Sequence, residues 1–183
     1  MTTALLLIDI QNDYFPDGTM ELEGSVAASL QAKRVLSYFR DNQLLRLHIQ
    51  HIATREKATF FLPNTFGVNI YEQVQPLTSE CVIEKHFPNS FRETVLFDVL
   101  QQHNVDHVVI LGMMTHVCID ASTRAALDFG FRCTVLQDAC ATKTLEFDDH
   151  AVSAKDAHHA FLAALRFCGA EVLTVDTFLT KNQ

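Results

Sequence analysis

Short apolar runs alternate with longer segments of helical periodicity along most of the chain. The apolar runs predict strands over residues 4–9, 44–51, 81–85, 107–112, 132–139 and 171–176. Apolar residues at helical spacing predict helices over 25–42, with Ser25 as N-cap, and over 93–104, 121–130 and 148–169. This alternation is typical of a parallel sheet covered on both faces. We therefore predict an α/β fold, a three-layer α/β/α sandwich with a central six-stranded, mostly parallel sheet.

One long segment, residues 53–70, follows neither period and predicts a loop. Long loops without secondary structure are often lids or specificity elements. No internal repeat interrupts the chain, and no linker rich in Ser, Gly or Pro divides it. The length of 183 residues suits a single core, so we expect one domain over 1–183.

Charge and composition exclude several classes of function. The formal net charge of −8 argues against binding to nucleic acid or to an anionic membrane surface. No apolar stretch has the length of a membrane span, and the apolar N-terminal segment meets Asp9 too early for a signal peptide. Five cysteines without a CxxC pair indicate reduced thiols, which favours a cytoplasmic protein.

Three chemically active side chains come at the carboxyl ends of predicted strands. Asp9 ends the first strand, Lys85 ends the third, and Cys118 follows the fourth, just before a helix. Ligand sites of parallel sheets lie beyond these strand ends, so we expect the three to converge. A helix N-terminus and an ammonium lower a thiol pKa, and a carboxylate can accept its proton. Taken singly, each has an ordinary alternative: a turn-capping Asp, a solvated Lys and an inert buried Cys.

The segments around these residues resemble the isochorismatase-like cysteine hydrolases, the superfamily that includes nicotinamidases and N-carbamoylsarcosine amidohydrolase. The resemblance rests on "LLLIDIQNDYF" around Asp9, "IEKHFPNSF" around Lys85 and "VILGMMTHVCIDASTRAALDFGF" around Cys118, with "LQDACAT" further on. These segments recur in the family order and spacing, and the likeness covers nearly the whole chain. It implies the family's six-stranded fold and an Asp–Lys–Cys catalytic triad.

The resemblance also implies a mechanism. Asp9 accepts the thiol proton of Cys118, Lys85 stabilises the thiolate, and the thiolate attacks an amide-type carbonyl to form a thioester. A cis peptide expected at Met113–Met114 aims the backbone N–H groups of Met114 and Cys118 at the oxyanion, where one donor is typically worth roughly 3–4 kcal/mol. The expected activity is hydrolysis of a non-peptide C–N bond in a small molecule.

Three other functions stay open. The isochorismatases proper cleave a vinyl ether and lack the cysteine nucleophile, which is present here as Cys118. A catalytically idle binding relative is disfavoured because all three residues of the set are intact. A redox-thiol protein would use an oxidisable Cys118, but no second cysteine lies close in sequence to resolve it.

The sequence predicts no cofactor and no bound metal. Metal-binding nicotinamidases carry an Asp-x-His after the second strand, whereas this chain has "IQHIATREKATFF" there. His48 and His51 are three residues apart, which on a strand points them to opposite faces. His51 is instead a candidate substrate contact. The other candidates are Phe15, Phe60, Phe91 and Thr115, and core packing is the alternative for the phenylalanines.

The expected partners are a small amide-type substrate and further copies of the chain. Members of the family are commonly dimers or larger, and residues 145–168 are apolar in composition. We therefore expect a homodimer or homotetramer.

Overall fold

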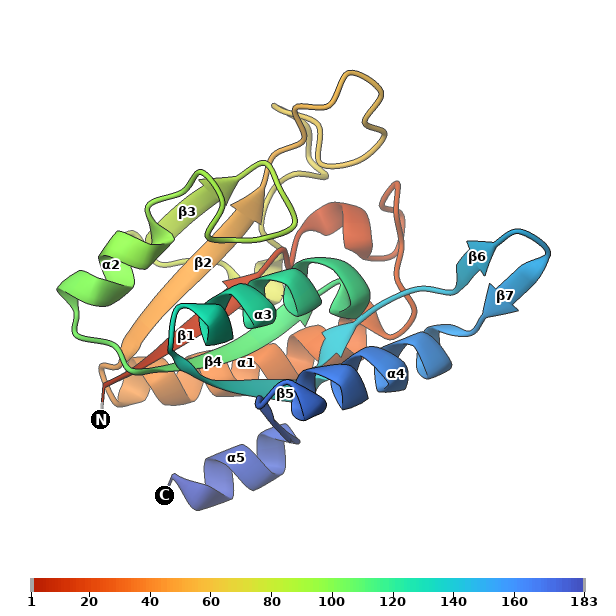
Figure 1. Ribbon diagram of the computed structural model, residues 1–183. Coiled ribbons are helices and arrows are strands. Elements are labelled where there is room, and N and C mark those ends of the chain that lie inside the picture. Colours follow the sequence, from red (N-terminus) through yellow and green to blue (C-terminus); the bar gives the residue numbers. More distant parts are fainter. Residues whose placement is uncertain (1, 183) are drawn as a thin grey trace.

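The apolar runs form one sheet in the computed structural model, which describes residues 2–182 (Figure 1). Its strands are β1 (Thr3–Ile8), β2 (Leu45–His51), β3 (Cys81–Lys85), β4 (His107–Met113), β5 (Arg132–Ala141) and β8 (Glu171–Leu173). Their spatial order is β3-β2-β1-β4-β5-β8, and all neighbouring strands are parallel. The predicted six-stranded parallel sheet is confirmed, with β1 and β4 at its centre.

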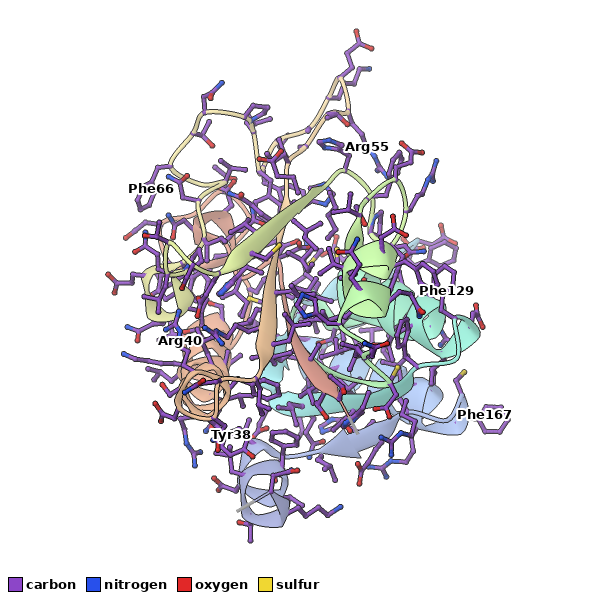
Figure 2. The ribbon with its side chains drawn as sticks, turned by 90° about the vertical axis from the view of Figure 1, so that its left-hand side faces the viewer. Tyr38, Arg40, Arg55, Phe66, Phe129 and Phe167 are labelled. Carbon is purple, nitrogen blue, oxygen red and sulfur yellow. The ribbon has the colours of Figure 1, made fainter. Side chains whose placement is uncertain are left out.

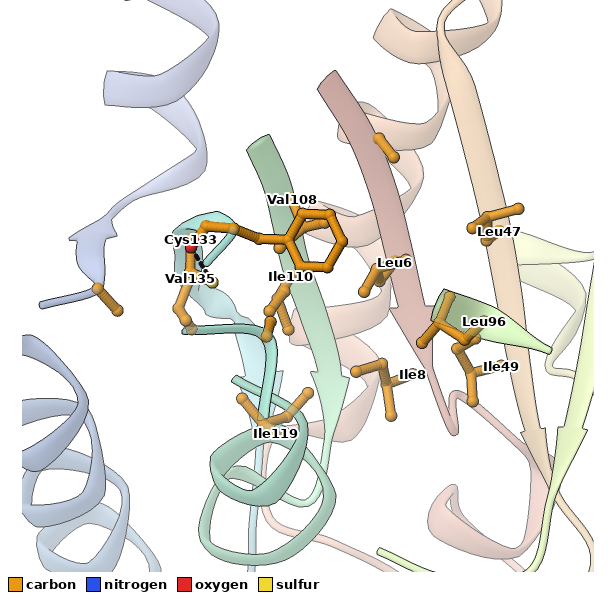
Figure 3. Close-up of a cluster of buried hydrophobic side chains, with 14 of the residues drawn as sticks. Leu6, Ile8, Leu47, Ile49, Leu96, Val108, Ile110, Ile119, Cys133 and Val135 are labelled. Carbon is orange, nitrogen blue, oxygen red and sulfur yellow. Dashed lines mark hydrogen bonds between the residues drawn. The ribbon is translucent and has the colours of Figure 1, made fainter. Parts of the chain in front are cut away.

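Helices cover both faces of this sheet. They are α1 (Ser25–Asp41), α2 (Leu96–Gln102), α3 (Asp120–Asp128), α4 (Ala154–Phe167) and α5 (Val175–Lys181), with short helical turns η1 (Asn12–Tyr14), η2 (Glu72–Val74) and η3 (Thr115–Ile119). Leu6 and Ile8 of β1 share a buried cluster with α2, α3 and α4 (Figure 3). The alternate residues Leu5 and Leu7 pack in a second cluster with α1 and α5. The two-residue period of the strand therefore builds two cores.

The segment before α4 differs from its prediction. The helix begins at Ala154 instead of 148, because the side chain of Ser153 caps it by accepting a hydrogen bond from Asp156 N. Residues before the cap form an antiparallel hairpin of β6 (Leu145–Phe147) and β7 (His150–Val152), which projects from the body in Figure 1.

Three other element boundaries also differ. The predicted helix over 93–104 begins only at Leu96, since Glu93 has a φ of 57°, outside the helical region. The predicted strand over 171–176 ends at Leu173, and Thr174 caps α5 in its place. The predicted cap Ser25 is the first residue of α1, which follows a left-handed Gly24. Between residues 2 and 182, no helix has both the length and the apolarity needed to cross a bilayer.

Candidate active site

Four neighbouring strands bring polar side chains to one edge of the sheet. Asp9 follows β1, His51 ends β2, Lys85 ends β3, and Cys118 lies in η3 after β4. The Lys85 Nζ lies 2.7 Å from Asp9 Oδ2 and 3.3 Å from Cys118 Sγ. It also lies 3.1 Å from His51 Nδ1. The structure thus brings together the three residues that strand ends predicted, in a triad-like arrangement, and adds His51.

A close approach of β1 and β4 places Asp9. Gly112 of β4 pairs with Ile8, has a φ of 126°, and a Cβ built there would lie 2.0 Å from the Ile8 carbonyl oxygen. Asp9 itself has a φ of 52°, in the left-handed region, so the chain turns immediately after β1. Glycine is therefore needed at 112 for the contact between two strands.

The cis peptide that the resemblance implied at Met113–Met114 is confirmed. It joins the end of β4 to η3, a π-helical turn that carries Cys118. The chain therefore passes from the central strand to the thiol within a few residues, and Met114 lines the cavity described below.

Burial controls the ionisation of the site. Asp9 and Lys85 are fully buried, and Cys118 is 4% exposed. Burial raises the pKa of the Cys118 thiol, the Asp9 carboxylate raises it further, and Lys85 opposes both. Burial alone would lower the pKa of Lys85, but Asp9 and Cys118 outweigh it and raise that pKa. The fold therefore raises the pKa of the Cys118 thiol, in contrast to the lowered thiol pKa expected from the sequence.

His51 is held as a neutral acceptor. Burial lowers the pKa of His51 to about 4, so Nδ1 accepts a hydrogen bond from the Lys85 ammonium and Nε2 carries the ring proton. Gln11 fixes the backbone of His51 from both sides, donating to its carbonyl oxygen and accepting from its N–H. The position of the imidazole is thus set by β2, Gln11 and Lys85 together.

The donor set of the site also has the composition of a metal site. One ligand atom each from Asp9, His51 and Cys118 lies within 4.8 Å of the others. The Lys85 Nζ, however, lies within 3.3 Å of all three residues, so the ammonium takes the central position that a metal ion would need. His48 bonds to Glu80 on the opposite face, as its spacing from His51 predicted. These residues fit Lys85 better than a metal.

A cavity of about 330 Å³ opens beside Cys118. Residues 53–61 of the predicted loop form much of its wall, and Asp13 anchors them by accepting a 2.6 Å hydrogen bond from Phe61 N. The volume suits a small molecule. The lining residues are Tyr14, His51, Ala53, Arg55, Lys57, Ala58, Thr59, Phe60, Phe61, Pro88, Met114, Val117 and Cys118.

Two of the predicted substrate contacts belong to the core instead. Phe15 is 1% exposed and stacks on Tyr71 with ring centroids 3.5 Å apart. Phe91 packs against Phe129 and Phe131, on the face of the sheet that α3 covers. Both residues follow the strand ends in sequence, but their rings turn back into the hydrophobic clusters. His51 and Phe60 do line the cavity.

Thr115 also does not line the cavity. Its hydroxyl donates to the carbonyl oxygen of Ala141 and lies 2.9 Å from Nδ1 of His158. The residue joins η3 to β5 and α4, so it supports the turn that carries Cys118.

Sequence reasoning missed three residues that shape the site. Gln11 holds His51, Asp13 holds the loop, and Tyr14 lines the cavity. A signal was present in the sequence, because Asp9, Gln11 and Asp13 are polar at every second position directly after a buried strand.

The fold and the site define a class, the isochorismatase-like hydrolases with a buried Asp–Lys–Cys set. The family model of the isochorismatase domain matches residues 3–177. The chain therefore belongs to the isochorismatase family.

Two of the relatives match this chain over nearly its whole length, and a third matches a shorter part of it. The uncharacterized isochorismatase family protein YddQ of Bacillus subtilis is 50% identical, with 98% of this chain and 99% of that protein covered. The solved structure of an assigned isochorismatase hydrolase from Oleispira antarctica has a TM-score of 0.93 and 45% identity, covering 98% and 96% of the two chains. Maleamate amidohydrolase of Pseudomonas putida is 32% identical over 74% of this chain and 70% of its own.

Proposed function

We propose that the protein is a cysteine hydrolase that cleaves the C–N bond of a small amide-type molecule through a thioester on Cys118. One observation carries the proposal: the buried Lys85 ammonium lies 2.7 Å from Asp9 Oδ2 and 3.3 Å from Cys118 Sγ. A carboxylate, an ammonium and a thiol in mutual reach supply a base, a charge partner and a nucleophile. The relative named maleamate amidohydrolase supports the same chemistry.

The proton transfer follows from the charges of the buried trio. Cys118 starts as a thiol, and Asp9 Oδ1 has no hydrogen-bond donor in the described part of the chain. Moving the thiol proton to Asp9 shifts one negative charge from the carboxylate to the sulfur, and both stand beside Lys85. The net charge of the trio does not change, so the step creates no unpaired charge in the interior.

The remaining steps conserve atoms and protons. The thiolate attacks the carbonyl carbon, and the backbone N–H groups of Met114 and Cys118 stabilise the oxyanion, at roughly 3–4 kcal/mol for one such donor. The C–N bond breaks as protonated Asp9 delivers its proton to the leaving amine. Water then attacks the thioester while Asp9 accepts a proton from it. The C–S bond breaks and Asp9 returns that proton to the sulfur, so that the carboxylic acid and the thiol of Cys118 are released.

The test is ammonia release from a panel of small amides that includes maleamate, nicotinamide and N-carbamoylsarcosine. Cys118→Ala is expected to abolish release, and Cys133→Ala, which removes another buried thiol outside the site, is the matched control. Acid quenching during turnover is expected to leave an acyl group that peptide mapping locates on Cys118. Normal turnover by Cys118→Ala would refute the proposal. Cleavage of isochorismate by that variant would favour vinyl ether chemistry.

A further inference from the structure

The charged side chains that line the cavity are cations. Arg55 and Lys57 line it from the loop that covers the sheet edge, and no lining residue is acidic. Figure 2 shows Arg55 on this loop, at the top of the molecule in that view. The chain as a whole carries a formal net charge of −8, so the positive charge that lines this cavity is opposite in sign to that of the whole protein. His51, which also lines the cavity, is neutral near pH 7 and does not add to this charge.

Neither cation is paired within residues 2–182. Glu56 stands between Arg55 and Lys57 in sequence, yet no ion pair joins it to either, and neither side chain makes a hydrogen bond there. Most other arginines do contact a carboxylate; these are Arg34, Arg40, Arg46, Arg92, Arg124 and Arg132. The two charges beside the cavity are therefore free to bind an anion.

The two cations and the Cys118 thiol differ in their exposure to solvent. Arg55 and Lys57 are exposed, whereas Cys118 is 4% exposed, and the wall of the cavity also includes Phe60 and Phe61. An occupant that reaches from the thiol to the cations would place an apolar body along this wall and an anionic group at the rim.

We propose that the substrate carries a carboxylate at the end remote from its scissile amide, and that Arg55 and Lys57 bind this carboxylate. The inference rests on the proposed function, because the thiol defines the reacting end. A guanidinium matches a carboxylate with two parallel hydrogen bonds, and a neighbouring ammonium adds a second charge. The substrate class is thus the half-amide of a short dicarboxylic acid, and hydrolysis yields the dicarboxylate and ammonia.

Binding is tested by calorimetry in the Cys118→Ala background, where no turnover occurs. The probes are succinamate and glutaramate, with butanamide and pentanamide as neutral counterparts. We expect the half-amides to bind at least tenfold more tightly than the neutral amides. Arg55→Gln/Lys57→Gln should remove this preference, because it leaves the apolar wall intact.

The matched control is Lys155→Gln/Arg166→Gln, which removes the same charge from exposed residues of α4 that do not line the cavity. We expect it to keep the half-amide preference, which separates a local site from the overall charge of the protein. The inference would be overturned if half-amides and neutral amides bound equally, or if neither bound. It would also be overturned if the two double variants lost the preference for half-amides to the same extent.

Turnover distinguishes this inference from the proposed function. With Cys118 present, the Arg55→Gln/Lys57→Gln variant should lose about tenfold in kcat/KM for half-amides and keep its rate on neutral amides. Raised salt should lower kcat/KM for half-amides alone, since exposed charges are screened. If neutral amides are cleaved through Cys118 and half-amides show no higher kcat/KM, the hydrolase proposal stands and the carboxylate inference fails.

Discussion

Replacing Asp9 with asparagine separates the structural role of the buried ion pair from its chemical role. Asp9 and Lys85 are fully buried, with 2.7 Å between Oδ2 and Nζ. Removing one partner of a buried pair costs about 3–5 kcal/mol, because the other charge stays uncompensated. Lys85 keeps acceptors in His51, Phe87 and Cys118, so we expect a loss near the lower limit, about 3 kcal/mol. A domain of this size would lose roughly 6–12 °C in Tm.

The double variant Asp9→Asn/Lys85→Met provides the comparison. It removes the uncompensated charge and fills the space of the lysine stem with an apolar chain, so we expect stability within about 1 kcal/mol of the natural protein. Both variants should lose the hydrolysis that the natural protein is expected to show, because the neutral amide that replaces the Asp9 carboxylate cannot accept the thiol proton.

Urea unfolding followed by fluorescence measures the first effect, and ammonia release measures the second. A double variant at least as unstable as Asp9→Asn would show that the uncompensated Lys85 charge is not the source of the lost stability. Turnover by Asp9→Asn at the natural rate would exclude the carboxylate as the base. The fold raises the pKa of Lys85 above its unfolded value near 10.5. The ion pair therefore makes its full contribution to the free energy of unfolding below pH 10.5 and loses that contribution as the pH rises through the folded pKa.

Four further outcomes are expected. The pKa of His51 is lowered from 6.5 to about 4, so the unfolded chain binds more protons than the folded chain between these two pH values. The free energy of unfolding should therefore fall as the pH drops from 6.5 to about 4. Urea midpoints should show a smaller fall for His51→Gln than for the natural protein. Burial would raise the pKa of Glu80, but Arg40 and Arg46 hold that pKa far below its usual range. Glu80→Gln should therefore lower the free energy of unfolding by about 2–4 kcal/mol at neutral pH. The difference between the two proteins should shrink in acid, where Glu80 of the natural protein becomes protonated. Prolonged chelation should leave the hydrolysis rate unchanged, and a loss restored by zinc or manganese would disprove this. Light scattering should report a homodimer or homotetramer, and a monomer at micromolar concentration would count against it.

The sequence alone determined the sheet and the three side chains of the triad-like arrangement. Strand positions follow from local apolar runs, and in a parallel sheet the carboxyl ends of neighbouring strands share one edge. Asp9, Lys85 and Cys118 could therefore be assigned to a common place without knowledge of any contact. The opposite directions of His48 and His51 followed in the same way, from the two-residue period of a strand.

Only the tertiary structure decided which other residues join the site. Phe15 and Phe60 are both aromatic and near the strand ends, yet one ring stacks in the core and the other lines the cavity. Local periodicity assigns a face to a side chain but not the neighbour that the ring meets. The hydrogen bonds that Gln11 and Asp13 accept join segments about 40 to 50 residues apart. A local pattern could therefore mark the two residues as unusual, but it could not identify the partners that they hold.

The ionisation of the site also depended on the tertiary structure. The sequence placed Cys118 at the start of a helix beside a cation, which favours a lowered thiol pKa. Burial and the Asp9 carboxylate reverse that direction in the fold. A thiol pKa is set by the surrounding charges and by the loss of water around the sulfur. Both quantities exist only after distant segments have packed together, whereas the identity of the thiol and its place after β4 are local properties of the chain.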